Sequence, residues 1–158
     1  MRKSVFAKPD ECTGCGTCEL VCTAFHEKKY GLRKSRIRNV KIGDTVRISM
    51  TCRLCDKPAC VAVCPTDALM QDANTGVIIV NDKRCNGCGW CIQSCPFGVM
   101  FFHPIKKVPI ACDLCNGDPV CVKDCPEEAL EMTTLDAFAS MVRGSTVKGL
   151  MEATKEAR

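Results

Sequence analysis

The sequence predicts an α+β protein that consists of two fused metal-binding modules in a pseudo-twofold arrangement, followed by a C-terminal helical extension. Three observations support this prediction: sixteen cysteines among 158 residues, their grouping into four sets of four, and a cysteine-free tail with helical periodicity. Only six Phe, one Trp and one Tyr are available for an aromatic core. We therefore expect bound metal to replace much of that core.

The first ten residues are charged and contain no apolar run, so they do not resemble a secretory signal. We therefore expect a cytoplasmic protein. Because disulfides are rare in that reducing compartment, the cysteines are expected to be metal ligands. No apolar stretch is long enough to span a membrane, and we expect no membrane span.

The cysteines fall into four groups, and none is left over. The groups are Cys12, Cys15, Cys18 and Cys22; Cys52, Cys55, Cys60 and Cys64; Cys85, Cys88, Cys91 and Cys95; and Cys112, Cys115, Cys121 and Cys125. Groups one and three read C-x-x-C-x-x-C-x-x-x-C, whereas groups two and four have a wider middle gap. Three closely spaced thiolates can bind three irons of a cubane, and the fourth cysteine, starting a short helix, would point toward a neighbouring cluster.

A proline follows the fourth cysteine in three of the four groups. These residues are Pro65, Pro96 and Pro126, and group one has Thr23 instead. The fixed φ of proline is expected to stop the short helix at that point.

Two other kinds of site use C-x-x-C pairs. Structural zinc takes four ligands from two separated pairs and does not need a third and fourth cysteine close behind the first two. A thioredoxin-type redox site needs one reactive pair in a βαβ unit rather than four quartets. Iron–sulfur clusters are therefore the favoured interpretation, and a zinc-dependent interaction module is the alternative of another class.

These motifs resemble those of bacterial ferredoxins. The fourfold set, with its widened second and fourth groups, is similar to the iron–sulfur subunits of molybdenum and tungsten oxidoreductases over residues 3–132. The resemblance implies a non-enzymatic electron-transfer subunit with four 4Fe-4S clusters. Some members of that family replace a third-group cysteine with tryptophan and hold a three-iron cluster, but here all four cysteines of the group are present beside Trp90.

The resemblance also implies that the last cysteine of each group serves the cluster of a partner group. The implied ligand sets are Cys12, Cys15 and Cys18 with Cys125; Cys112, Cys115 and Cys121 with Cys22; Cys52, Cys55 and Cys60 with Cys95; and Cys85, Cys88 and Cys91 with Cys64. On this scheme residues 1–30 and 105–132 form an outer module and residues 31–104 contain a hairpin and the inner module. Residues 133–158 form the helical extension.

Two segments before the tail have periodic patterns. Alternating apolar residues around Gly43 and Asp44 predict a hairpin between Val40 and Met50. Residues 66–80 predict strand, turn and strand around Asn74-Thr75-Gly76.

The tail predicts two helices. The first would begin at Thr133, with a capping box to Asp136, and end at Gly144. The second would carry the apolar stripe of Val147, Leu150 and Met151.

The formal net charge of the chain is +4. Four cubanes of about −2 each when oxidised and about −3 when reduced would bring the total to about −4 and about −8. A run of basic residues without an acid could offset this charge or face an acidic partner, and its alternative role is a solvated hairpin face. The run consists of Lys28, Lys29, Arg33, Lys34, Arg36, Arg38 and Lys41.

Since only Tyr30 offers a stacking ring near this run, we expect no nucleic-acid partner. His26 and His103 could replace a ligand or tune a nearby cluster, but they are expected to be structural or surface residues, because sixteen cysteines already fill sixteen ligand positions.

The leading hypothesis is a wire of four clusters between a catalytic oxidoreductase subunit and an acceptor. The most specific expected partner is a molybdenum or tungsten cofactor enzyme, in particular a tungsten aldehyde oxidoreductase. The acceptor can be a flavin-containing or other subunit, or another copy of this chain in end-to-end association. A free-standing polyferredoxin is the alternative within the same class.

Overall fold

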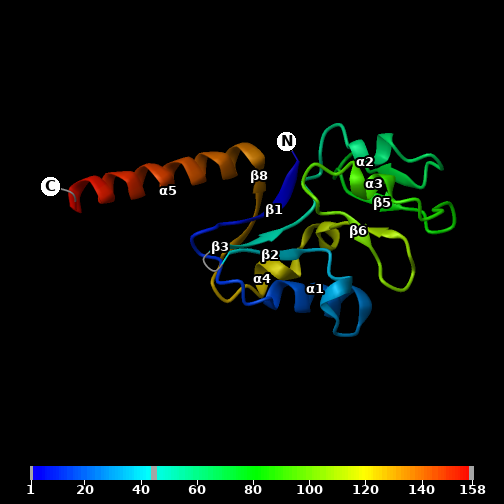
Figure 1. Ribbon diagram of the computed structural model, residues 1–158, viewed down its shortest axis with the longest axis horizontal. Coiled ribbons are helices and arrows are strands. Elements are labelled where there is room, and N and C mark those ends of the chain that lie inside the picture. The colour runs from blue at the N-terminus through cyan, green and yellow to red at the C-terminus, as the bar shows by residue number, and fades with distance from the viewer. Residues whose placement is uncertain (1, 44–45, 157–158) are drawn as a thin grey trace.

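The computed structural model of the chain describes residues 2–43 and 46–156. The chain doubles back on itself, so that its first strand, β1 (Lys3–Ala7), pairs with its last, β8 (Leu130–Thr134), in an antiparallel ladder. Figure 1 shows these two strands side by side, with the C-terminal helix leaving the body of the molecule beyond them. The N-terminal and C-terminal cysteine groups are thereby brought to the same part of the fold.

The structure has mixed helix and strand content, as predicted. The outer elements are α1 (Thr17–Glu27), the turn η1 (Leu32–Lys34), the hairpin of β2 (Arg38–Ile42) and β3 (Val46–Met50), the turn η2 (Leu114–Gly117) and α4 (Val120–Lys123). The elements between them are α2 (Ala59–Ala62), β4 (Leu69–Gln71), β5 (Ile78–Val80), α3 (Trp90–Gln93), β6 (Phe101–Phe102) and β7 (Pro109–Ile110). Helix α1 packs on α4, and α2 packs on α3.

Both predicted hairpins are present. β2 pairs with β3 in antiparallel register, and Gly43 enters the turn with a φ of 60°. Asp44, the other predicted turn residue, lies outside the described residues. β4 pairs with β5, but β4 begins at Leu69 rather than at Thr66, because the preceding Asp67 has a φ of 47° and lies in a turn.

The fourth cysteine of a group does not start a helix, and that prediction was wrong. The short helices α2, α3 and α4 each contain the third cysteine of their group and end before the fourth. A proline follows the fourth cysteine in each case, and a residue before proline disfavours helical φ and ψ. With Thr23 in place of proline, α1 continues past Cys22 and is 11 residues long in total.

Cysteine side chains form a large part of the buried interior. The largest fully buried side chains are aliphatic or hydroxylic, such as Ile37, Leu54 and Thr51, and they surround the cysteines. The buried cysteines are Cys18, Cys22, Cys52, Cys60, Cys91, Cys112 and Cys121. The core is therefore organised around thiols rather than around aromatic rings.

The tail is one helix, α5 (Leu135–Glu156), and not the two that the sequence predicts. The helix continues through Gly144, because one glycine costs a helix only about 1 kcal/mol relative to alanine and need not end it. Thr133 belongs to β8, and the hydroxyl of Thr134 accepts a hydrogen bond from the Ala137 N–H at 3.3 Å. The predicted capping position is thus wrong by one residue.

The start of helix α5 packs against the body of the molecule. Phe138 stacks on Phe6 of β1, with ring centroids 4.5 Å apart. Farther along, Val147, Leu150 and Met151 are exposed. None of the helices in the described part of the chain is both long enough and apolar enough to cross a membrane.

A pair of glycine variants tests the continuous helix. Gly144 and Gly98 both face open space, but only Gly98 has a positive φ, of 59°. We expect Gly144→Ala to stabilise α5 by roughly 0.5–1 kcal/mol and Gly98→Ala to destabilise its own turn by about 1 kcal/mol. Amide hydrogen exchange of the two segments measures both effects. Faster exchange in α5 of Gly144→Ala would contradict an unbroken helix.

Candidate metal centres

Four cysteines from the two ends of the chain line one cavity. Cys12 and Cys15 come from the loop before α1, Cys18 lies in the first turn of α1, and Cys125 follows α4. The contact between α1 and α4 brings them together.

A second cavity is lined by Cys52, Cys55, Cys60 and Cys95. The first three surround the start of α2, and Cys95 follows α3. The fourth cysteine of group three therefore lies with the first three of group two, since α2 and α3 pack against each other.

A third set gathers around Cys121. Burial raises the pKa of Cys121, and the nearby sulfurs of Cys112, Cys22 and Cys115 raise it further. Cys22 lies in α1, whereas the others belong to group four. The set is thus drawn from the same two ends of the chain as the first cavity.

The fourth set gathers around Cys91. Its pKa is raised first by burial and then by Cys85, Cys88 and Cys64. Cys64 follows α2, and its sulfur accepts a hydrogen bond from the Ala68 N–H at 3.2 Å. The structure thus brings together the members of each of the four implied ligand sets.

All sixteen cysteines are free thiols. Burial raises the pKa of Cys18 to about 11 and that of Cys60 to about 12, so both are protonated at neutral pH in the absence of metal. Four thiols around one cavity match the ligand requirement of a 4Fe-4S cluster, which binds four thiolates. The donor sets therefore fit such clusters.

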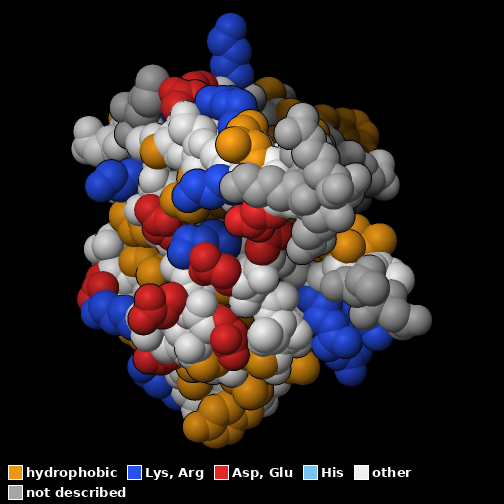
Figure 2. Space-filling model, turned by 90° about the vertical axis from the view of Figure 1, so that its left-hand side faces the viewer, with side chains coloured by type: hydrophobic (Ala, Val, Ile, Leu, Met, Phe, Trp, Pro, Cys, Tyr) orange, Lys and Arg blue, Asp and Glu red, His pale blue; other side chains and the backbone are white. Residues whose placement is uncertain are grey.

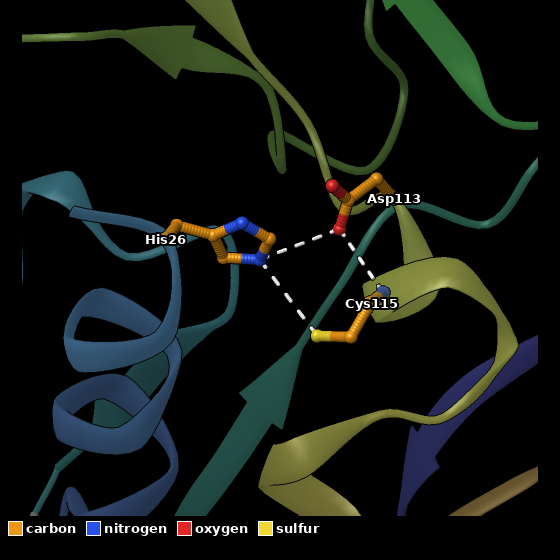
Figure 3. Close-up of side chains that lie close together, drawn as sticks. All are labelled: His26, Asp113 and Cys115. Atoms are coloured by element: carbon orange, nitrogen blue, oxygen red, sulfur yellow. Dashed lines mark hydrogen bonds and ion pairs between the residues drawn. The ribbon is translucent and has the colours of Figure 1, made fainter. Parts of the chain in front are cut away.

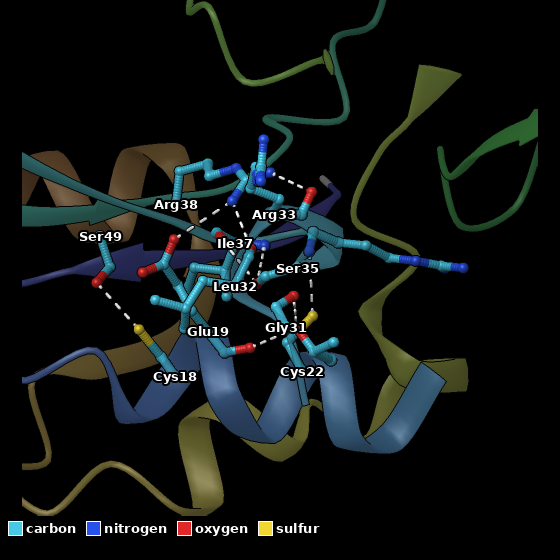
Figure 4. A network of polar contacts seen from close by, with 12 residues as sticks. Cys18, Glu19, Cys22, Gly31, Leu32, Arg33, Ser35, Ile37, Arg38 and Ser49 are labelled. Carbon is cyan, nitrogen blue, oxygen red and sulfur yellow. Dashed lines mark hydrogen bonds and ion pairs between the residues drawn. The ribbon is translucent and has the colours of Figure 1, made fainter. Parts of the chain in front are cut away.

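Several sulfurs accept hydrogen bonds from outside the four sets. The Arg36 N–H donates to Cys22 at 3.2 Å, and the Ser49 hydroxyl lies 3.3 Å from the sulfur of Cys18. Figure 4 shows Ser49 of β3 pointing toward Cys18 at the start of α1. Such donors stabilise negative charge on a ligand sulfur.

His26 lies beside the sulfur of Cys115, a position that the sequence left open only as its less favoured alternative. Its Nε2 is 3.7 Å from the sulfur of Cys115 and 3.4 Å from Asp113 Oδ1, as Figure 3 shows. Burial and the neighbouring Arg36 lower the pKa of His26, against the effect of Asp113. Because Cys115 belongs to a cysteine set, we assign this group of three donors to the surroundings of that set rather than to a separate metal site. No sequence signal links His26 to Cys115, since 89 residues separate them.

His103 has the structural role that the sequence predicts. It is 3% exposed, and its Nδ1 accepts hydrogen bonds from the N–H groups of Ile105 and Lys106. Its Nε2 lies 3.3 Å from Glu27 Oε2 at the end of α1. His103 therefore links the turn between β6 and β7 to α1.

Three residues of the basic run are paired with acids, which neither interpretation of the sequence anticipated. Arg36 pairs with Asp113, Lys34 with Glu27 at 3.6 Å and Arg38 with Glu19 at 3.6 Å. Arg38 also donates to the carbonyls of Leu32 and Arg33. These residues fix the segment between α1 and β2.

Charges of both signs are interspersed on the face toward which α5 points, as Figure 2 shows. Near the first cavity, Lys8 bonds to Glu11 at 2.9 Å, and this bond together with Glu131 and Glu128 raises the pKa of Lys8. No single sign of charge dominates the face in view.

The raised thiol pKa values predict that cluster assembly depends on pH. Burial keeps Cys18 and Cys60 protonated, and iron binds thiolates, so assembly must release protons. We expect reconstitution at fixed iron and sulfide to become more complete as the pH rises from about 6.5 to about 8.5, and cluster loss to accelerate at lower pH. The visible absorbance of the clusters measures both. A yield that falls over this range would contradict the assignment of buried thiols as ligands.

Comparisons with known proteins identify the family. The 4Fe-4S dicluster domain matches residues 44–135, and a 4Fe-4S binding domain matches residues 9–30. The polyferredoxin-like subunit of the aliphatic sulfonate oxidoreductase of Pyrococcus furiosus is 38% identical over 82% of this chain and 77% of its own length. One subunit of the anaerobic dimethyl sulfoxide reductase of Escherichia coli is 31% identical over 83% of this chain and 73% of its own length.

Two further proteins are also similar to the chain. Protein NrfC of Escherichia coli is 36% identical over 79% of this chain, which spans 62% of the length of NrfC. A subunit of the active site complex BamBC of benzoyl coenzyme A reductase shares the fold, with a TM-score of 0.50 and 22% identity over 89% of this chain and 96% of that one. The family matches and the cysteine sets lead to one conclusion: the chain belongs to the 4Fe-4S dicluster domain family and is an iron–sulfur electron-transfer subunit of oxidoreductase complexes, not itself catalytic.

Proposed function

We propose that the sixteen cysteines hold four 4Fe-4S clusters in the four crossed sets, and that these clusters lie in two modules related by a pseudo-twofold arrangement. Residues 1–30 with 105–132 form the outer module, and residues 31–104 contain the inner one. The observation that carries the proposal is the cavity that Cys125 shares with three cysteines more than a hundred residues earlier. The matching cavity with Cys95 supports the same crossing in the inner module.

When bound, a 4Fe-4S cluster supplies one-electron reduction and oxidation at a potential that its surroundings set. The chain's own residues hold the sulfurs, exclude water by burial and donate hydrogen bonds to individual sulfurs. No residue is needed for bond chemistry.

The proximity of sulfurs from different sets supports a linear order of sites. Cys18 of the first set is close enough to Cys121 of the second to raise its pKa, after burial and the members of its own set. Cys52 of the third set likewise raises the pKa of Cys112 of the second set. The third and fourth sets exchange their last cysteines, Cys95 and Cys64, which follow α3 and α2. The order from one end to the other is therefore first, second, third and fourth.

The proposed partner is a catalytic subunit with a molybdenum or tungsten cofactor, in the cytoplasm. A subunit of a dimethyl sulfoxide reductase and a subunit of an aliphatic sulfonate oxidoreductase are among the relatives, which supports a place in such a complex. A tungsten aldehyde oxidoreductase is the most specific candidate. The cluster at the other end of the series would pass electrons to or from an acceptor subunit, for example a flavin protein, or a second copy of this chain.

We further propose that the catalytic subunit docks on residues 134–158. The exposed Val147, Leu150 and Met151 lie on the part of α5 that extends beyond the Phe138 contact. A free polyferredoxin has no need of an apolar surface of this kind, so the exposed residues favour a subunit over a diffusing carrier.

The first test is metal content. We expect about sixteen irons and as many sulfides per anaerobically purified chain, from four cubanes. Cys125→Ser should perturb the cluster held by Cys12, Cys15 and Cys18, whereas Cys22→Ser should perturb that of Cys112. Electron paramagnetic resonance of the two reduced variants distinguishes the clusters. If Cys125→Ser changed the signal of the Cys112 cluster, and Cys22→Ser that of the cluster held by Cys12, Cys15 and Cys18, the crossed scheme would be excluded. Stoichiometric zinc would exclude electron transfer.

The second test concerns docking. Leu150→Asp introduces a charge into the apolar surface of α5, and Ser145→Asp introduces the same charge at another exposed position of the same helix. We expect Leu150→Asp to weaken co-purification with the catalytic subunit at least tenfold, about 1.4 kcal/mol, while iron content stays unchanged. Ser145→Asp should bind normally. Equal binding by the two variants would mean that the catalytic subunit docks elsewhere.

A further inference from the structure

The β2–β3 hairpin contains no cysteine, yet one face of it covers the first cysteine group. Arg47 of β3 packs against Gly14, between Cys12 and Cys15, so closely that a Cβ on Gly14 would lie 2.9 Å from Arg47 Cβ. Gly14 also has a φ of 70°, which favours glycine. The hairpin is therefore held directly against the loop that carries the first ligands.

Ser49 lies two residues after Arg47, and thus on the same face of β3. It is 3% exposed, and its Oγ lies 3.3 Å from the sulfur of Cys18 and 4.0 Å from that of Cys12. Ser49 and its cross-strand partner Asn39 both line the cavity of the first set. Within residues 2–43 and 46–156, these two sulfurs are the only hydrogen-bond partners of the Ser49 hydroxyl.

A buried hydroxyl whose hydrogen-bond partners are metal-bound sulfurs must be the donor in those hydrogen bonds. A thiolate can only accept a hydrogen bond, so the Ser49 O–H donates when Cys18 is a metal ligand. Even in the free thiol the bond from Ser49 lowers the pKa of Cys18, against the larger effect of burial, which raises it. Ser49 thus stabilises negative charge on the Cys18 sulfur.

We infer that Ser49 is a positioning residue that raises the reduction potential of the cluster held by Cys12, Cys15, Cys18 and Cys125. Reduction adds one negative charge, part of which resides on the ligand sulfurs, and a donor to sulfur stabilises the reduced state more than the oxidised one. The inference rests on the proposed ligand sets.

The other sulfur donors differ from Ser49 in kind. The bonds to Cys22 and Cys64 from the N–H groups of Arg36 and Ala68 belong to the backbone, which a side-chain substitution leaves in place. The half-buried Thr66 hydroxyl lies 3.7 Å from the Cys64 sulfur, farther than Ser49 lies from Cys18. The exposed Cys15 thiol donates to the Thr17 hydroxyl, where water can replace that hydroxyl. Among the described hydrogen-bond donors to cysteine sulfurs, Ser49 is the buried side-chain hydroxyl. Its removal therefore leaves no replacement donor at the Cys18 sulfur.

The test measures the potentials of all four clusters in the complete chain by a redox titration followed by electron paramagnetic resonance. Cys15→Ser identifies the signal of the first cluster, because that ligand is replaced. Ser49→Ala is expected to lower this one midpoint, so that the reduced-to-oxidised ratio at the wild-type midpoint falls about tenfold, or 59 mV for a one-electron couple. Ser35→Ala is the matched control, since Ser35 is also buried but its hydroxyl donates to the Ile37 carbonyl at 2.8 Å.

A second pair of variants separates the hydroxyl from the shape of the side chain. Ser49→Thr and Ser49→Val have the same branched shape, and only the first retains a hydroxyl. We expect Ser49→Thr to restore the wild-type midpoint relative to Ser49→Val. Unchanged potentials in Ser49→Ala at full iron content, or equal potentials for the Thr and Val variants, would overturn the inference.

Iron analysis keeps this inference distinct from the proposed ligand sets. If the wild-type chain binds only about twelve irons, with the first set vacant, the ligand scheme fails, and with it the premise. If the wild type is complete but all three Ser49 variants lose the first cluster, Ser49 serves to retain the cluster, and the tuning role is overturned.

Discussion

The structure depends on gathering four sulfurs around one cavity, with at least one sulfur of each set buried. Burial makes the charged form of such a thiol unfavourable, as the raised pKa values of Cys18 and Cys60 show. Four neighbouring thiolates without a cation would repel one another, whereas iron neutralises them and completes the interior. The short helices, the paired ends of the chain and the small aliphatic core all follow from the need to surround such sites.

One substitution in the repeated motif changes how the parts of the molecule meet. Thr23 stands where the other groups have proline, so α1 continues to Glu27. The added turn carries His26 to Cys115 and Asp113, and Glu27 to the buried His103. The long helix is thus both a support for two ligands and the link between the chain's two ends and its middle.

The sequence predicted the features that depend on local spacing. The four cysteine groups follow from spacing, and the two hairpins follow from turn residues and alternation. The three short helices lie before the fourth cysteine and do not start at it, so their position was not predicted. It could not predict partners distant in sequence, such as the acids that pair with the basic run or the contact of His26 with Cys115. The break expected at Gly144 was wrong because the cost of one glycine is smaller than the gain from continuing the helix. That Cys125 lies beside Cys12 came from family resemblance, since spacing within a group does not specify which distant group completes it.

The surroundings of the sulfurs favour short-range over long-range control of charge. Arg36 and Arg38 are paired with carboxylates, so the net field they exert on the sites is small. A free surface charge acts over about 10 Å at moderate salt and would therefore influence several neighbouring sites together. A hydrogen bond acts on the sulfurs of one site, as those of Ser49 and the Arg36 N–H do. Donors of this kind let neighbouring sites differ in potential, and a hairpin without cysteines is one way to bring such a donor to a single site.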